Sequence, residues 1–131
     1  AANTPDTLVR RDSAGNFTSV QLNYNATDSW SSDGPTVTPN DRMMKGTIKF
    51  QAAGGYFKFK NLPAGTYDVY AYLEENGGGA EGEIAIGTDT NYVAWESSFP
   101  GTFTQVTGSS PGVFVAGNYA KWSAVSAAGV T

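Results

Sequence analysis

The sequence contains no cysteine and no histidine. Without cysteine there are no disulfide bonds or thiol nucleophiles, and without either residue zinc sites of the usual kind and histidine-based catalytic triads are excluded. Lysine and arginine total only 8 against 12 acidic residues, which gives a net charge of -4. This balance lacks the basic excess that marks nucleic-acid-binding surfaces, so we expect no nucleic-acid partner.

The sequence also lacks an apolar run of about 18 residues, the length that predicts a membrane-spanning helix. No signal peptide is visible. Glycine, serine, threonine, asparagine, tyrosine and tryptophan are plentiful, whereas leucine is scarce. This composition suits a secreted, extracellular bacterial or viral module that does not enter a membrane. The length of 131 residues predicts one domain with its own core.

Apolar residues recur at every second position rather than at helical spacing. In TYDVYAYL, alternate residues from Tyr67 to Leu73 share one face, whereas Asp68, Tyr70 and Tyr72 share the other. The same alternation runs through TSVQLNYN, GTIKFQA and GYFKFKNL, and further strands are expected at GEIAIG, NYVAW, TFTQV, GVFVA and NYAKWSAV. Turn residues separate these segments roughly every 8 to 12 residues, which indicates an all-β chain.

About nine short strands predict an antiparallel β-sandwich or jelly roll. Between two of them, Pro63 and Gly65 predict a hairpin turn in which Gly65 takes a positive φ. We interpret residues 1–16 as a linker or short entry strand and residues 17–131 as the sandwich. Alternation assigns five large side chains to its core: Phe50, Phe57, Phe59, Tyr67 and Ile84.

Four segments in this order resemble a galactose-binding-like β-sandwich that is widespread in secreted bacterial proteins: LNYNATDSWSSDG, RMMKGTIKF, LPAGTYDVYAYL and FPGTFTQVTGSSPGVFVAGNYAKWSAV. The resemblance covers residues 20–125 and is strongest at Leu62–Tyr72 and Gly117–Trp122. It implies a carbohydrate-binding or cell-surface accessory domain and a core position for Trp122. From it we expect a module appended to a glycoside hydrolase that binds a neutral polysaccharide or oligosaccharide, such as β-glucan or hemicellulose.

A second resemblance concerns the beginning of the sequence. DTLVRRDSAGNFTS is similar to segments at domain junctions in phage tail fibres and bacterial surface fibres. The alternative function is therefore a structural or adhesive domain of such a fibre, which would assemble with copies of itself.

Aromatic side chains outside the predicted core are the candidates for sugar recognition, because a pyranose stacks its apolar face on a ring. We expect a stacking platform of Trp30, Tyr72 and Trp95, with Tyr70 as a further candidate. A loop-anchoring role is the alternative for Trp95. The remaining candidate ligand-binding residues are Glu74, Glu96, Tyr119 and Lys121. If Trp30 and Trp95 belong to the core instead, the binding groove is expected around Tyr119 and Lys121.

The acidic residues do not predict an enzyme. Glu74 and Glu75 are adjacent and would point to opposite faces of a strand, and Glu81 and Glu83 lie in or near a glycine-rich loop. Glycosidases need two carboxylates held rigidly on either side of the scissile bond. The sequence shows no such pair, so we expect no catalytic residues and no organic cofactor.

A structural calcium ion is the one cofactor that the sequence leaves open. Asp28, Asp33, Asp41 and Asp89 lie in expected loops, where carboxylate and carbonyl oxygens bind calcium. Aspartate in a turn more often caps its own backbone, and that alternative stays open here.

Overall fold

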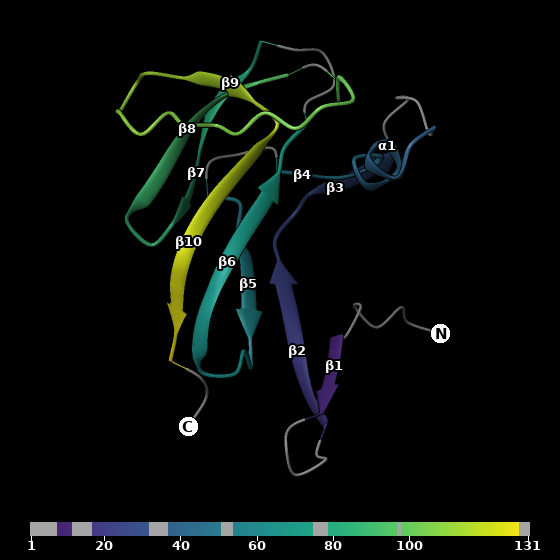
Figure 1. Ribbon diagram of the computed structural model, residues 1–131, viewed down its shortest axis with the longest axis vertical. Coiled ribbons are helices and arrows are strands. Elements are labelled where there is room, and N and C mark those ends of the chain that lie inside the picture. Colours follow the sequence, from purple (N-terminus) through teal and green to yellow (C-terminus); the bar gives the residue numbers. More distant parts are fainter. Residues whose placement is uncertain are drawn as a thin grey trace. The chain divides into compact units, whose positions relative to one another are not determined.

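The computed structural model describes residues 8–11, 17–31, 37–50, 54–74, 79–96 and 98–128, with only the backbone described for residues 8–11, 17–19 and Trp30. Within these ranges the chain forms ten β-strands and one short helix (Figure 1). The all-β prediction is therefore confirmed. The strands and the helix are, in order, β1 (Leu8–Arg11), β2 (Phe17–Tyr24), β3 (Asp28–Ser31), α1 (Pro39–Met43), β4 (Gly46–Lys49), β5 (Phe57–Lys60), β6 (Gly65–Tyr72), β7 (Glu81–Ile86), β8 (Asp89–Trp95), β9 (Val115–Gly117) and β10 (Tyr119–Ala127).

The strands form four sheets with the orders β1-β2-β5, β3-β4, β10-β6 and β7-β8-β9. Strand β2 is antiparallel to both β1 and β5, and β7 is antiparallel to β8. Strand β9, in contrast, runs parallel to β8, so this one pairing departs from the antiparallel arrangement that the sequence predicted. A parallel neighbour requires a crossover rather than a tight turn, and the long segment between β8 and β9 provides it.

The chain divides into two compact units, each built from separate stretches of sequence. Unit 1 comprises Ala1–Asp28, Ile48–Tyr67 and Ser126–Thr131, and unit 2 comprises Ser29–Thr47 and Asp68–Val125. Strand β1, which pairs with β2 in unit 1, lies in the segment that we interpreted as a linker or entry strand. The predicted domain boundary at residue 16 stays a prediction.

Within unit 1, the side chains of β5 depart from the predicted core. Phe57 and Phe59 are 47% and 53% exposed, so their assignment to the core is wrong. Their strand is four residues long and lies at the edge of its sheet. Alternation in the sequence predicts which face of the strand each side chain lies on. It does not predict whether another part of the protein packs on that face.

The turn after β5 also differs from the prediction. The positive φ belongs to Asn61, at 59°, and not to Gly65, which begins β6 in extended backbone. Asparagine tolerates this left-handed conformation better than most residues, because its short side chain bonds locally. The two strands that flank the turn pair with different partners, β5 with β2 and β6 with β10, so they do not form the predicted hairpin.

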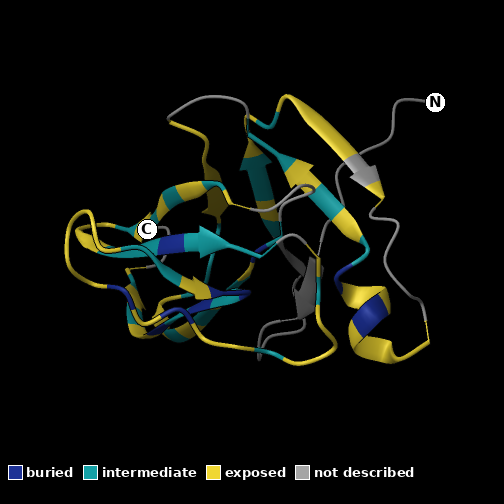
Figure 2. Ribbon diagram, turned by 90° about the horizontal axis from the view of Figure 1, so that it is seen from above, coloured by how far each residue is buried: buried dark blue, intermediate teal, exposed yellow. Residues whose placement is uncertain are grey.

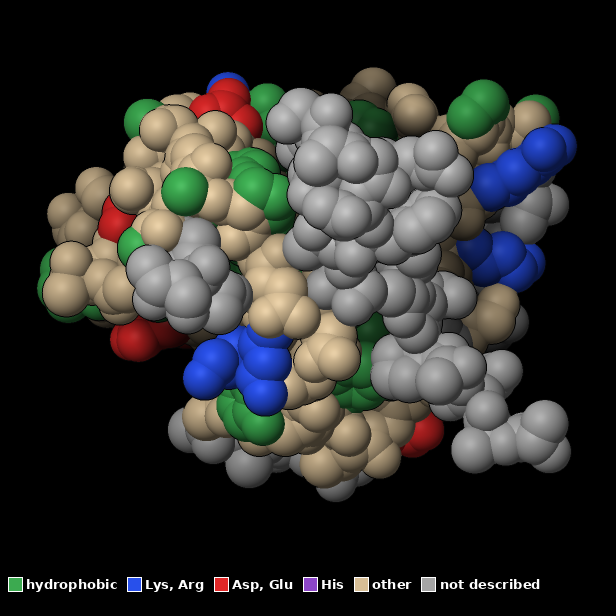
Figure 3. All heavy atoms as spheres, turned by 90° about the horizontal axis from the view of Figure 1, so that it is seen from below, with side chains coloured by type: hydrophobic (Ala, Val, Ile, Leu, Met, Phe, Trp, Pro, Cys, Tyr) green, Lys and Arg blue, Asp and Glu red, His purple; other side chains and the backbone are tan. Residues whose placement is uncertain are grey.

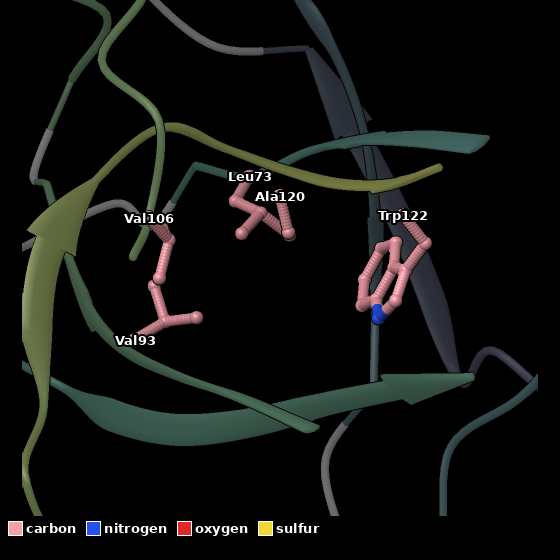
Figure 4. Packing of buried hydrophobic residues seen from close by; sticks show 5 residues of the cluster. All are labelled: Leu73, Val93, Val106, Ala120 and Trp122. Carbon is pink, nitrogen blue, oxygen red and sulfur yellow. The ribbon is translucent and has the colours of Figure 1, made fainter. Parts of the chain in front are cut away.

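The core of unit 2 is a cluster of five buried side chains from β8, β10 and the segments that follow β6 and β8 (Figure 4): Leu73, Val93, Val106, Ala120 and Trp122. Trp122 is only 3% exposed, which confirms its predicted core position. Its indole Nε1 donates a hydrogen bond to the Asp89 carbonyl at 3.1 Å, so the polar atom of the buried ring has a partner. Ile84 packs against this cluster, as the alternation predicted.

The one helix in the described part of the chain was not predicted. Thr38 caps α1 by accepting a hydrogen bond from the Asp41 amide, and the Asp41 carboxylate accepts one from the Thr38 amide at 2.8 Å. This capping box, with Pro39 in the first turn, is a recognised start signal for a helix. Asp41 is the buried residue of α1, and the rest of the helix is exposed (Figure 2).

Strand β10 changes its side-chain alternation near its end. Ala120 and Trp122 are buried, but beyond them the more buried positions are Val125 and Ala127, so the pattern shifts by one residue. Ala124 lies at the shift and has a φ of 57°. An extra residue in left-handed conformation is how a β-bulge re-aims the side chains that follow it.

Candidate functional site

The outward side of β6 carries a row of exposed aromatic side chains. Val69 and Ala71 pack against the core of unit 2, whereas Tyr70 and Tyr72 are 48% and 46% exposed. The predicted alternation of this strand is therefore confirmed: one set of side chains builds the core, and the two tyrosines face away from it.

Strand β10, next to β6 in the same sheet, continues this side. Because Ala120 and Trp122 point into the core, Tyr119 and Lys121 point outward. The ring of Tyr119 lies 6.4 Å from that of Tyr70 and 6.2 Å from that of Tyr72, measured between centroids. These spacings lie within the range of interacting aromatic pairs. The pairing of two strands thus gathers three tyrosines into one cluster.

The loop between β8 and β9 adds two phenylalanines to this cluster. The Phe103 ring lies 5.3 Å from Tyr72 and 6.2 Å from Tyr119, and it stands nearly perpendicular to Tyr119. Phe99 in turn lies 4.8 Å from Phe103. We call the five residues Tyr70, Tyr72, Phe99, Phe103 and Tyr119 the aromatic face. Neither phenylalanine was predicted as a site residue. Phe103 belongs to the segment TFTQV, which was expected to form a strand but lies in the loop, with only an isolated bridge at Gln105.

A charged pair borders the aromatic face beside Tyr70. Lys121 Nζ lies 3.0 Å from an Asp68 carboxylate oxygen and 5.2 Å from the centroid of the Tyr70 ring. The hydrogen bond with Lys121, together with one from the Ala124 amide, lowers the pKa of Asp68. The same bond with Asp68, followed by one with Tyr70, raises the pKa of Lys121. Both groups therefore stay charged over a wide pH range and cancel each other's charge at this border.

Two of the predicted polar site residues lie elsewhere in unit 2. Glu96 accepts a hydrogen bond from the Asn118 side-chain amide at 3.1 Å, so it supports the loop that carries Phe99 and Phe103. Glu74 follows β6 and is half-buried, and its Oε2 is buried without a hydrogen-bond partner among the described residues.

The structure brings together some of the predicted site residues and not others. Tyr72, Tyr119 and Lys121 lie on the same side of the β10-β6 sheet, close to one another. Trp95 instead packs against the core, and its ring lies so close to Gly82 that an added Cβ would be 3.2 Å from it. This favours the anchoring alternative for Trp95. The backbone of Trp30 belongs to β3, but its side chain lies outside the described residues.

The candidate calcium ligands that the structure describes belong to different secondary-structure elements. Asp41 caps α1, Asp28 begins β3 and Asp89 begins β8, whereas Asp33 lies outside the described residues. In the part of the chain that is described, no three acidic side chains are close enough to hold a metal ion together. For Asp41, the capping alternative is the one that the structure shows.

The chain was also compared with known proteins. No protein-family profile matches the chain, and no curated protein or solved structure matches it significantly. None of the helices formed by the described residues has the length and apolarity needed to cross a membrane.

Proposed function

We propose that this chain is a non-catalytic carbohydrate-binding module that recognises a neutral polysaccharide through the aromatic face. The observation that carries the proposal is the exposure of Tyr70 and Tyr72 beside the rings of Tyr119 and Phe103. Exposed, contiguous apolar surface on a small domain is typical of a binding site. Rigid aromatic rings lose little conformational entropy when they bind a ligand, and their flat faces suit the apolar side of a sugar ring.

The polar groups at the border of the aromatic face suit the hydroxyl groups of a sugar. Lys121 offers donors and Asp68 offers acceptors, and Gln105, whose Oε1 accepts a hydrogen bond from the Tyr119 hydroxyl at 3.3 Å, still has its amide donors. Because the lysine and the aspartate neutralise each other, the border favours an uncharged ligand. On the face shown in Figure 3, hydrophobic side chains among the described residues are interspersed with other uncharged side chains and backbone, and charged side chains form separate small groups.

The ligand class and wider context follow from the sequence resemblance. A galactose-binding-like β-sandwich of jelly-roll type, secreted and appended to a glycoside hydrolase, would use such a face to hold the enzyme on β-glucan or hemicellulose. No catalytic role is proposed for the carboxylates. Asp68 is paired with Lys121 and Glu96 with Asn118, whereas Glu81 and Glu83 lie exposed on β7.

The proposal is tested by isothermal titration calorimetry and affinity gels against cellulose, mixed-linkage β-glucan, xyloglucan, xylan and mannan. We expect binding to at least one of these neutral glycans, without release of reducing sugar. We also expect the binding to be weakened by Tyr72→Ala but not by Glu83→Gln, an exposed carboxylate on β7 that serves as the control. Absence of binding across the panel would reject the proposal.

A second function, the structural or adhesive domain of a fibre, is favoured by a separate observation in unit 1. Four aromatic side chains on or beside β2 and β5 are each about half exposed: Tyr24, Tyr56, Phe57 and Phe59. Apolar surface of this kind also suits a protein–protein interface. Multi-angle light scattering separates the two functions, since a fibre domain forms a trimer or another closed assembly and a sugar-binding module stays monomeric at micromolar concentration.

A further inference from the structure

We infer that Asn118 is a positioning residue that fixes the ring of Phe103 on the aromatic face, an inference that rests on the proposed function of this face as a binding surface. Asn118 is 1% exposed and cannot itself touch a ligand. It directly precedes Tyr119, the first residue of β10, and every polar atom of its side chain has a partner.

The side chain of Asn118 holds the loop on both sides of Phe103. Its Oδ1 accepts a hydrogen bond from the Thr104 amide at 2.9 Å, and its Nδ2 donates one to the Thr102 carbonyl at 2.9 Å. The residue between these two bonds is Phe103. Because the peptide groups on either side of Phe103 are held by one buried amide, the direction of its Cα–Cβ bond is fixed relative to β10.

The backbone of Asn118 extends this arrangement to β6. Its amide donates to the Thr104 carbonyl at 2.9 Å, and its carbonyl accepts a hydrogen bond from the Leu73 amide at 2.9 Å. Leu73 directly follows Tyr72, whose ring contacts that of Phe103. Asn118 therefore bonds to the chain neighbours of both rings, and a single residue sets their separation.

Two neighbouring residues strengthen this assignment. Glu96, at the beginning of the same loop, accepts the second hydrogen of the Asn118 amide and fixes the amide's orientation. At Gly117, the last residue of β9, an added Cβ would lie 2.9 Å from the Thr104 carbonyl, so the loop and the end of β9 are in direct backbone contact. Close backbone packing and the hydrogen bonds of the Asn118 side chain therefore both hold the loop in place. A buried polar group whose hydrogen bonds are all satisfied makes its surroundings more rigid.

A double-mutant cycle tests whether Asn118 acts through Phe103, with soluble mixed-linkage β-glucan as the probe and calorimetry at a temperature where every variant is folded. We expect Phe103→Ala and Asn118→Ala each to weaken binding about tenfold, the loss of one stacking ring. If Asn118 acts through Phe103, the double variant is also only about tenfold weaker, rather than the roughly hundredfold of independent effects. A hundredfold loss in the double variant would overturn the inference.

A second measurement needs no ligand and separates the two proposals. In the unliganded protein, we expect nuclear Overhauser effects between the ring protons of Tyr72 and Phe103, and we expect Asn118→Ala to abolish them. Preserved ring contacts in Asn118→Ala would overturn the positioning role. If the wild type shows these contacts but does not bind the glucan, the choice of ligand fails and the positioning role stands.

Two substitutions of Glu96 provide a matched control that does not depend on whether Asn118→Ala folds. Glu96→Ala removes the acceptor for Asn118 Nδ2 and should weaken the Tyr72–Phe103 contacts. Glu96→Gln keeps a side-chain oxygen that accepts the same bond and should preserve them. Identical spectra for both Glu96 variants would count against the assignment.

Discussion

The rings of Tyr72 and Phe103 contact each other with their centroids 5.3 Å apart, although one residue ends a strand and the other lies in a long loop. Strand β6 supplies the regular part of the aromatic face, because every second side chain points outward. The loop between β8 and β9 supplies Phe99 and Phe103, whose positions do not follow from the two-residue alternation of a strand. The proposed recognition by this face would therefore depend on both the sheet and a loop that must be held in place.

Removal of single rings should separate binding from folding. We expect Tyr72→Ala to weaken glycan binding about 10- to 100-fold, in line with about 1–3 kcal/mol for a ring that stacks on a flat partner. Because Tyr72 is 46% exposed and points away from the core, the melting temperature should change little. Calorimetry gives the affinity and differential scanning fluorimetry the stability. A Tyr72→Ala variant that binds normally would exclude this ring from the site.

The core tryptophan should show the opposite behaviour. Trp122→Ala removes a ring that is 3% exposed, and we expect a loss of about 3–5 kcal/mol in the free energy of unfolding, enough to prevent folding. Trp122→Phe keeps most of the volume and loses the hydrogen bond to the Asp89 carbonyl and a few ring atoms, so it should fold with a smaller loss. Urea denaturation followed by circular dichroism compares the two variants with the wild type. Equal stability of Trp122→Ala and the wild type would contradict the core position.

Ala124 should be a site where glycine stabilises the protein. Its φ of 57° is strained for any residue with a Cβ, and glycine reaches this conformation freely. We expect Ala124→Gly to raise the free energy of unfolding by about 0.5–1 kcal/mol, because the relief of strain exceeds the entropy that glycine loses. Ala127→Gly, in the same strand but without a positive φ, is the control and should lower the free energy of unfolding. If both substitutions lower the free energy of unfolding equally, the assignment of a left-handed conformation to Ala124 is wrong.

The ion pair of Asp68 and Lys121 should make a small contribution to stability with defined pH limits. The pKa of Asp68 is lowered from 3.8, so its contribution is complete above that pH and is lost as the pH falls through the folded value. The pKa of Lys121 is raised from 10.5, so its contribution is complete below that pH and is lost as the pH rises through the folded value. Because both side chains are partly exposed, the effect on the whole unfolding free energy should be slight.

The direct measurement of this pair is a carbon NMR titration of the Asp68 carboxylate. Lys121→Met removes the main cause of the lowered pKa, so the midpoint for Asp68 should move upward. The Ala124 amide still donates to Asp68 in this variant and should keep part of the shift. An unchanged midpoint in Lys121→Met would show that the pair is not formed in solution.

The regular elements of this fold could be predicted from the sequence, and so could part of the site. The TYDVYAYL alternation predicted both the core side of β6 and its outward tyrosines, because a strand turns successive side chains to opposite faces. Tyr119 and Lys121 follow from the same rule on β10. Their proximity to Tyr72 requires the pairing of β6 with β10, which no local pattern specifies.

The failures of prediction have particular physical causes. Phe103 lies in a loop, and its position depends on bonds to Asn118, far along the chain. The helix α1 was missed although Thr38, Pro39 and Asp41 are a recognisable helix start, because the helix that follows is too short to show a periodic pattern. Phe57 obeys the alternation but is exposed, since alternation predicts a face and not what covers it.

The outward row of β6 has a consequence for how strongly one copy of the module can bind. Alternate residues on a strand are about 7 Å apart, so Tyr70 and Tyr72 would contact only a short stretch of the proposed polysaccharide. A small contact area of this kind favours rapid exchange over tight capture. Physiological retention on a polymer would then arise from avidity: two or more linked copies, or one copy beside another binding site, would rebind at high effective concentration before the whole assembly diffuses away.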